Sequence, residues 1–266
     1  MNSRALRCLA LSFLLLPLLV LSAYANPINL GTAGGYAVLG GSAVTNTGST
    51  TLIGNLGVSP GCALSGAGTM TVSGTTNLCN AAALKAQSDL TAAYLQALNL
   101  KPTGILTGQN LGGLTLTTGV YSFASSAQLT GQLTLEGKPG ALFVFQIGSA
   151  LTTATSSSVI FINSLTGKAT TDPNIFWQVG SSATLGTSTS FEGNILALSS
   201  ITLNTSASIT CGSALAQNGA VTLQGNTITG CGPGGTRTTV PEPGTMGLLG
   251  TGLAILAGAA RRKMGI

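Results

Sequence analysis

The stretch SATLGTSTSF at residues 182–191 recurs 18 residues later as SITLNTSASI at residues 200–209. A shortened version, AVTLQGNTI at residues 220–228, follows after about 20 more. A period of this length is typical of a β-helix, in which each turn of the solenoid, or coil, contains three short strands. Equivalent residues of successive coils stack, which predicts an internal leucine ladder (Leu185, Leu203 and Leu223) and a threonine ladder on one wall (Thr184, Thr202 and Thr222).

Short runs of apolar and small polar residues, separated by Gly and Asn, also precede the repeat. They include YAVL at residues 36–39 and TLIGNLGV at residues 51–58, and later 113–116, 119–123, 132–135, 141–147 and 159–162. Such runs predict strands joined by tight turns. Several of the later runs are apolar at both odd and even positions, which indicates strands that are buried on both faces.

Residues 80–99 differ from the rest of the body, because they are rich in Ala, Leu, Gln and Lys and lack Gly and Pro. They predict one amphipathic helix of about five turns. Asn77 or Asn80 is its expected N-cap, and Pro102 follows its end. Five large side chains are expected along its buried face: Leu84, Leu90, Tyr94, Leu95 and Leu98.

Charged residues make up only 6 % of the chain, and histidine is absent. The formal net charge is +5, but five cations lie in the two terminal segments, so the body is close to neutral. A body without a basic stripe argues against a nucleic-acid partner. Of its carboxylates, Asp89 falls on the predicted helix, and Glu136, Asp172 and Glu192 are scattered along the chain. This distribution argues against an enzyme, and no metal or other cofactor is expected.

Residues 1–25 have the features of a secretory signal peptide. Arg4 and Arg7 form its charged region, residues 9–21 its apolar region, and AYA at residues 23–25 its cleavage site. The mature chain is therefore expected to begin at Asn26, and the alternative is an uncleaved anchor.

The C-terminal segment, residues 236–266, resembles the PEP-CTERM sorting tag of Gram-negative bacteria. VPEP at residues 240–243 precedes an apolar run over 246–260, and RRK follows at residues 261–263. The run has 15 residues, fewer than the roughly 20 that a helix needs to span a bilayer core. The resemblance implies a transient inner-membrane anchor, processing by an exosortase-type machinery, and delivery to the outer surface or the medium. The alternative is a plain tail anchor.

Four cysteines remain once the signal peptide and its Cys8 are removed, and an even number in an exported chain favours disulfides. Proximity in sequence suggests Cys62–Cys79 and Cys211–Cys231, one of three possible pairings. The second pair is separated by 20 residues, about one coil of the repeat. A zinc site is the rival interpretation, but the chain has no histidine and lacks the short paired spacings of such sites.

Several segments together resemble the ice-binding protein family of cold-adapted bacteria, fungi and diatoms. Besides the predicted helix, they are 30–39 (LGTAGGYAVL), 44–48 (VTNTG), 54–61 (GNLGVSPG), 119–121 (GVY), 174–180 (NIFWQVG), 191–197 (FEGNILA) and 219–223 (GAVTL). The resemblance implies an all-β domain over residues 26–235: a right-handed, discontinuous β-helix of triangular section with the α-helix packed alongside. It further implies that N-terminal strands, around residues 28–60, stack on the C-terminal coils, and that residues 58–80 form a cap.

The resemblance also implies adsorption to ice through a flat face that follows a Thr-small-x-Thr/Asn pattern. An uncharged lattice of small hydroxylated side chains can match the oxygen array of ice, and the restricted χ1 of Thr limits the entropy lost on contact. Thr184, Thr202 and Thr222 are expected on another wall, and Trp177 in the core. The predicted contact residues are Thr187, Thr189, Ser190, Thr205, Ala207, Ser208 and Thr227, with Thr153, Thr155 and Thr130 as earlier rungs.

An ice crystal surface is thus the predicted partner of a secreted or cell-surface monomer that inhibits ice growth and recrystallisation. A non-catalytic structural or adhesive protein of the exopolysaccharide matrix is the alternative, because it would keep the same fold and sorting tag. Exposed aromatic side chains on the face would favour glycan binding, whereas a flat Thr/Ser/Ala face would favour ice.

Overall fold

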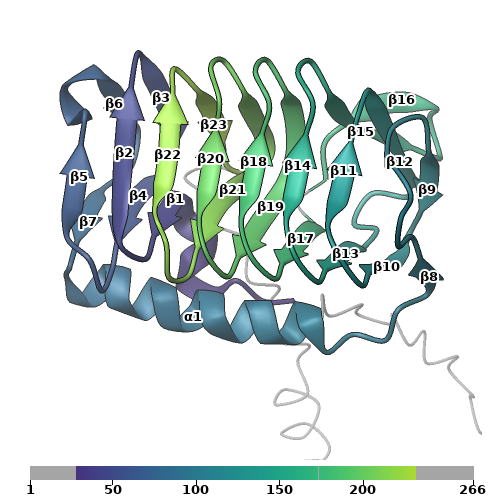
Figure 1. Ribbon diagram of the computed structural model, residues 1–266, viewed down its shortest axis with the longest axis horizontal. Coiled ribbons are helices and arrows are strands. Elements are labelled where there is room, and N and C mark those ends of the chain that lie inside the picture. The colour runs from purple at the N-terminus through teal and green to yellow at the C-terminus, as the bar shows by residue number, and fades with distance from the viewer. Residues whose placement is uncertain (1–27, 173, 232–266) are drawn as a thin grey trace, which may run out of the picture.

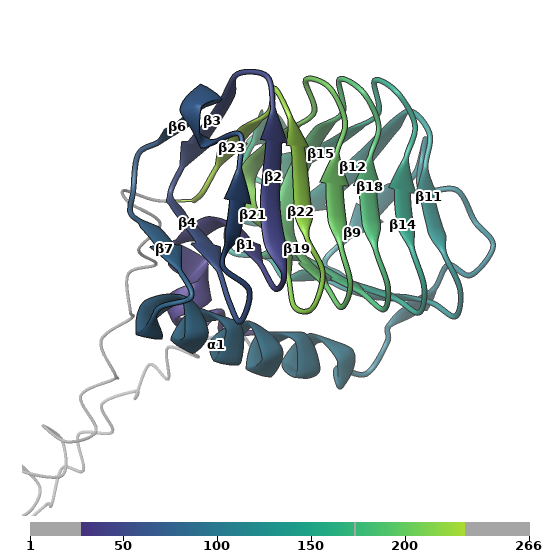
Figure 2. The same ribbon diagram turned by 60° about the vertical axis from the view of Figure 1, so that its left-hand side comes forward.

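The chain winds in successive coils, and each complete coil contributes a strand to each of three walls (Figures 1 and 2). The computed structural model describes residues 28–172 and 174–231. The predicted signal peptide and C-terminal sorting segment lie outside the described residues. The predicted β-helix with one long helix alongside is confirmed.

The first wall, here called the seven-stranded wall, faces the viewer in Figure 1. All of its neighbouring strands are parallel. In spatial order its strands are β11 (Ala127–Leu129), β14 (Leu151–Thr153), β18 (Ala183–Leu185), β20 (Ile201–Leu203), β22 (Val221–Gln224), β2 (Ala43–Thr47) and β5 (Ala63–Ser65).

The second wall, the helix-side wall, is the one that the long helix covers. Its strands are β8 (Gly104–Ile105), β10 (Gly119–Phe123), β13 (Phe143–Ile147), β17 (Ile175–Val179), the second halves of β19 (Ser190–Ala197) and β21 (Ser208–Ala216), β1 (Tyr36–Gly40), β4 (Asn55–Val58) and β7 (Thr76–Leu78).

The third wall contains β9 (Thr115–Thr117), β12 (Gln132–Gly137), β15 (Ser158–Asn163), the first halves of β19 and β21, β23 (Thr227–Thr229), β3 (Thr50–Ile53) and β6 (Met70–Val72). The strand β16 (Lys168–Thr170) folds back on β15 in the antiparallel sense. Gly193 bends β19 between two walls with φ +103°. A Cβ at Gly212, the bend of β21, would lie 1.8 Å from the Gly193 carbonyl oxygen, so this corner requires glycine.

The coil order does not follow the sequence. The N-terminal strands β1, β2 and β3 pair with β21, β22 and β23 of the last coil. Residues 58–80, expected to be a cap, contain the terminal strands β5, β6 and β7 and the short 3-10 helix η2 (Ala67–Thr69). This segment therefore ends the solenoid as a further coil, which the Cys62–Cys79 disulfide ties together.

The long helix α1 (Ala81–Leu98) begins at Asn80, whose side-chain oxygen accepts a hydrogen bond from the Ala83 amide at 2.9 Å. The predicted buried face is only partly correct. Leu90 and Tyr94 are buried, but Leu84, Leu95 and Leu98 are 60 %, 48 % and 46 % exposed. The face that meets the solenoid instead carries small residues: Ala83, Ala86, Ala93 and Ala97.

The outward side chains of the helix-side wall explain this difference. They are large, and they form one cluster with the helix: Tyr36, Leu39, Val120, Val144, Phe176, Leu196 and Leu215. The four alanines let the helix backbone approach such a surface closely, whereas leucines at these four positions would overfill the space. Within residues 28–172 and 174–231, no helix combines the length and apolar character needed to cross a membrane.

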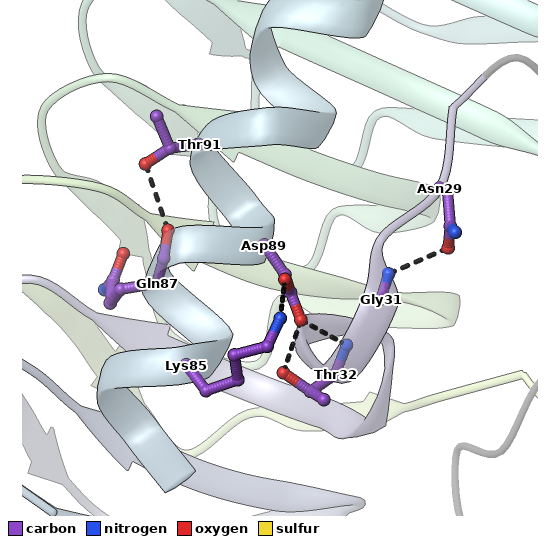
Figure 3. Close-up of polar contacts among 7 residues, drawn as sticks. All are labelled: Asn29, Gly31, Thr32, Lys85, Gln87, Asp89 and Thr91. Atoms are coloured by element: carbon purple, nitrogen blue, oxygen red, sulfur yellow. Dashed lines mark hydrogen bonds and ion pairs between the residues drawn. The ribbon is translucent and has the colours of Figure 1, made fainter. Parts of the chain in front are cut away.

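A polar contact also joins the helix to the 3-10 helix η1 (Gly31–Gly35) (Figure 3). One carboxylate oxygen of Asp89 accepts bonds from the Thr32 amide, at 2.8 Å, and the Thr32 hydroxyl, at 2.7 Å. The other carboxylate oxygen pairs with Lys85, one helical turn earlier. The helix thereby holds the N-terminal entry to β1.

Trp177 lies in the core, as predicted, with no exposed surface. Its ring stacks on Phe145 with centroids 3.9 Å apart, and Phe145 stacks on Tyr121 at 5.7 Å. These residues are register partners in consecutive strands, so the ladder follows directly from the coil stacking.

Candidate functional site

A ladder of threonines runs down the outer face of the seven-stranded wall. Strand pairing aligns Thr152 with Thr184, Thr184 with Thr202, Thr202 with Thr222, and Thr222 with Thr45. Gln128 and Ser65 extend this column at its two ends. We call these seven residues the strand ladder. Because neighbouring strands lie about 4.8 Å apart, five threonines repeat at that spacing.

A second column, the turn ladder, follows at the edge where each coil leaves this wall. It consists of Thr155, Thr187, Thr205, Gln224 and Thr47. Backbone bonds between successive coils align it, because the residue after each member donates to the next member's carbonyl. These bonds are Ser156 to Thr187, Ser188 to Thr205, Ser206 to Gln224 and Gly225 to Thr47, at 2.9, 2.9, 3.1 and 2.8 Å. The four threonines of this ladder are exposed.

The two ladders are three residues apart along each of three coils. Thr152 precedes Thr155, Thr184 precedes Thr187, and Thr202 precedes Thr205. A third column, two residues before the strand ladder, contains only small residues: Ala150, Ser182, Ser200, Ala220, Ala43 and Ala63. The wall on this side of the strand ladder is therefore lined by small side chains, whereas Gln224 separates Thr205 from Thr47 in the turn ladder on the other side.

Charge is confined to other surfaces within the described part of the chain. Lys85 and Asp89 lie on α1, and Lys101 follows that helix. The remaining charged residues belong to the third wall and the segments that leave it: Glu136, Lys138, Lys168, Asp172 and Glu192. The seven-stranded wall is accordingly a neutral surface.

Three of the predicted contact residues are placed inside the solenoid, and their assignment to an outer face is wrong. Thr189 and Ala207 have no exposed surface, and Thr153 is 3 % exposed. For Thr189 and Ala207 the reason is the turn between the walls, in which the preceding residues, Ser188 and Ser206, adopt left-handed φ values of 56° and 59°. This reversal points the following side chain inward, which the sequence pattern did not reveal. Thr153 is buried because it alternates with the exposed Thr152 along β14 and therefore points into the core.

The other predicted contact residues fall on two different surfaces. Thr155, Thr187 and Thr205 belong to the turn ladder, and Thr130 is exposed in the equivalent turn of the preceding coil. Ser190, Ser208 and Thr227 are aligned with one another on the third wall, not on the seven-stranded wall. Thr184, Thr202 and Thr222, expected on another wall, lie on the same surface as the turn ladder.

Sequence reasoning missed Thr45 and Thr47 as members of these ladders. A signal was present, because AVTNT at residues 43–47 matches AVTLQ at residues 220–224, the strand with which it pairs. The match is not part of the repeat along the chain, because the coil order is discontinuous and β2 stacks on β22.

The acids are less scattered than the sequence indicated, because Asp172 and Glu192 lie together behind the third wall. The Asp172 amide donates to Glu192 Oε1 at 2.8 Å, and the Gly140 amide donates to Asp172 Oδ2 at 2.7 Å. Burial raises the pKa of Glu192 to about 7, and the nearby Asp172 carboxylate adds to the rise. Asp172 is 2 % and Glu192 4 % exposed. Both side chains are too buried to contact a polysaccharide. Their hydrogen bonds instead hold the loop before β17 in place.

The structure pairs the cysteines as Cys62–Cys79 and Cys211–Cys231, the pairing suggested by the sequence. Among the described residues, no three His, Cys, Asp or Glu side chains are grouped so that they could hold a metal ion.

Comparisons with known proteins agree with this architecture. The ice-binding-like family model matches residues 38–229, and the PEP-CTERM protein-sorting motif matches residues 239–263. The ice-binding protein of Nostoc sp. (strain HG1) is 52 % identical over 239 residues, which are 88 % of this chain and 87 % of the relative.

Two solved structures have the same fold. The ice-binding protein from an Antarctic biological consortium superimposes with a TM-score of 0.70 at 42 % identity, covering 76 % of this chain and 90 % of that one. The ice-binding protein from the Antarctic ascomycete Antarctomyces psychrotrophicus has a TM-score of 0.71 at 35 % identity, covering 76 % and 97 %. The prediction of a non-catalytic protein is consistent with these relatives. The chain belongs to the ice-binding-like family.

Proposed function

We propose that this protein is exported and binds ice through the seven-stranded wall, with the strand ladder and the turn ladder as the contact surface. The observation that carries the proposal is the alignment of both threonine ladders on one uncharged wall. The names of the Nostoc relative and of the solved Antarctic proteins support the same activity.

The geometry of the wall suits an ice surface. The strand ladder repeats at about 4.8 Å, and alternate residues along each strand lie about 6.7 Å apart. An extended solid offers no isolated charge to pair with, so a surface gains from many equivalent weak contacts. Thr offers a methyl group and a hydroxyl in a side chain with few rotamers, so little conformational entropy is lost when it meets ordered water.

The core behind the wall keeps it rigid. The residues that alternate with the strand ladder point inward and are buried, among them Leu151, Leu185, Leu203, Leu223 and Val44. Parallel pairing across all seven strands fixes the spacing of the outer side chains from behind. A lattice held in this way is organised before it meets the crystal.

A direct test substitutes one bulky side chain in each ladder. Thr184→Tyr in the strand ladder and Thr187→Tyr in the turn ladder are expected to abolish most of the inhibition of ice recrystallisation, because the added ring separates the wall from a flat crystal. Thr71→Tyr is the matched control, since Thr71 is an exposed mid-strand threonine on the third wall. Equal activity in all three variants would show that another surface binds ice.

The adhesive alternative receives less support from the same surface. Carbohydrate sites commonly use exposed aromatic rings, and none lies on the described seven-stranded wall. Tyr36, Tyr94 and Trp177 are buried elsewhere. Ice is therefore the better-supported partner, and the C-terminal motif supports sorting to the cell surface after exosortase-type processing.

A further inference from the structure

The corner between the seven-stranded wall and the third wall contains a buried set of polar side chains, here called the corner network. Its members are Thr153, Ser157, Thr189, Asn226, Thr50 and Asn46, and each is less than 5 % exposed. Most solenoid interior positions of this protein hold apolar residues. Six buried polar residues at one corner therefore call for a physical reason.

Thr153 and Thr189 link two neighbouring coils. The Gly186 amide donates to Thr153 Oγ1 at 2.9 Å, the two threonine hydroxyl oxygens lie 2.8 Å apart, and Thr189 Oγ1 donates to the Ala154 carbonyl at 3.2 Å. Thr153 Oγ1 accepts from the Gly186 amide and can donate its own proton to Thr189 Oγ1, which in turn donates to the Ala154 carbonyl. The chain of bonds thus runs from the turn of one coil through both hydroxyls to the turn of the previous coil.

The other members of the network connect successive turns in the same way. Ser157 Oγ donates to the Leu129 carbonyl at 3.0 Å. The Asn226 amide group donates to the carbonyls of Asn204 and Ala207, both at 2.9 Å. Thr50 Oγ1 accepts from the Asn226 backbone amide at 3.1 Å and donates to Asn46 at 2.6 Å.

One step of the solenoid has no buried polar bridge of this kind. Between the turns at residues 186–189 and 204–207 the buried position is Ala207. The side-chain contact there is a long one, from Ser208 Oγ to the Thr189 carbonyl at 3.5 Å. The bonds through Thr153 and Thr189 are therefore the buried side-chain bonds that tie the turn at residues 186–189 to a neighbouring coil.

We infer that Thr153 and Thr189 are positioning residues for the turn ladder: they touch no ice, and they hold the turns that carry Thr155 and Thr187 in register with the strand ladder. The inference rests on the proposed function of the wall. The bridged atoms belong to Ala154 and Gly186, which are the immediate neighbours of Thr155 and Thr187. A turn free to move would break the flat lattice even if every contact side chain were present.

The experiment replaces the two hydroxyls with methyl groups in the otherwise unchanged protein. In Thr153→Val/Thr189→Val the buried Gly186 amide loses its hydroxyl acceptor, so amide exchange at Ser156 and Ser188 is expected to accelerate near 0 °C. The concentration needed to inhibit ice recrystallisation is expected to rise by about tenfold, because the contact lattice loosens. Thr189→Ser, which keeps the hydroxyl, is expected to retain activity close to that of the unmodified chain.

Ile195→Val is the matched control for stability, because Ile195 is fully buried in the helix-side wall and lies behind neither threonine ladder. It should lower the melting temperature while leaving ice activity unchanged. If the double variant folds and inhibits recrystallisation as well as the unmodified protein, the inference is overturned. If the double variant fails to fold, Thr189→Val alone is judged by the same criterion, since it leaves Thr153 as the acceptor for Gly186.

Failure of the proposed function gives a different pattern. In that case Thr184→Tyr leaves the recrystallisation activity intact, or the unmodified protein has none. The exchange rates at Ser156 and Ser188 still report whether the hydroxyls position the turns. Unchanged exchange in the double variant would refute the positioning role on its own.

Discussion

The backbone amide of Asp172 donates a hydrogen bond to the buried carboxylate of Glu192, at 2.8 Å, and the carboxylate of Asp172 lies close enough to raise the pKa of Glu192. Two acids 20 residues apart thus meet where the loop before β17 crosses the third wall. The Phe161 amide also donates to Glu192, and the Trp177 indole donates to the Glu192 carbonyl at 3.0 Å.

The raised pKa of Glu192 predicts that the folded protein loses stability as the pH rises towards neutrality. Burial raises the pKa of Glu192 from 4.5 to about 7, so the folded protein holds a proton that the unfolded chain has released between these values. The contribution of Glu192 to the free energy of unfolding is complete below pH 4.5, declines as the pH rises to about 7 and is absent above it. It amounts to at most about 3 kcal/mol.

Glu192→Gln removes the titration while keeping a hydrogen-bond acceptor. Denaturant unfolding at pH 4.5, 6 and 8 is expected to give a flatter profile for this variant than for the unmodified protein. Glu136→Gln, at an exposed position of β12, is the control and should keep the original slope. A profile for Glu192→Gln that declines as steeply as the original would contradict this account.

The contact between Asp89 and Thr32 predicts a loss of stability in acid. Burial acts to raise the pKa of Asp89, but hydrogen bonds from Lys85 and Thr32 and the charge of Lys85 outweigh it, so the pKa lies below its ordinary value. A depressed folded pKa contributes stability above about pH 4, and this stability is lost as the pH falls. Asp89→Asn is expected to cost about 1 kcal/mol at pH 7.

Thermal unfolding at pH 7 and pH 3 measures this effect, which should be smaller at pH 3. Thr32→Ala is a useful comparison, because it removes the hydroxyl bond and keeps the backbone bond to the same oxygen. The prediction fails if Asp89→Asn lowers stability equally at both pH values.

The face of α1 that packs on the solenoid can be tested with two leucines. Leu90→Ala is expected to cost about 2–5 kcal/mol, because this side chain is fully buried between the helix and the helix-side wall. Leu95→Ala removes the same atoms from a half-exposed position and should cost less than about 1 kcal/mol. Urea unfolding of both variants compares them directly, and equal losses would mean that the helix faces the solenoid differently.

The disulfide between Cys62 and Cys79 is expected to stabilise the terminal coil. It closes a loop of 17 residues, for which the chain-entropy estimate is about 3 kcal/mol. In Cys62→Ser/Cys79→Ser, hydrogen exchange should accelerate first in β5, β6 and β7. Exchange in β10 and β13, near the other end of the solenoid, is the internal reference, and uniform acceleration throughout would contradict a local role.

Much of the architecture was predictable from local pattern. The 18-residue repeat of residues 182–209 predicted the stacked coils, since equivalent residues of a solenoid must alternate between core and surface in the same way. The Gly-free, Ala-rich segment predicted the helix, and the structure selects Asn80 from the two expected N-caps, Asn77 and Asn80. The leucines of the helix were misassigned, because their burial depends on the size of the side chains that face them from the helix-side wall.

The position of the candidate surface depended on contacts between distant parts of the chain. The sequence alone determined that hydroxylated and apolar residues repeat coil by coil on a chain of low charge. Only the tertiary structure decided which threonines share a wall. One left-handed residue in each turn sends Thr189 into the core and leaves Thr187 outside, and the stacking of β2 on β22 adds Thr45 to Thr222 across 177 residues of sequence. The physical reason is that a repeat predicts which residues are equivalent, whereas backbone reversal and strand pairing decide where those residues point.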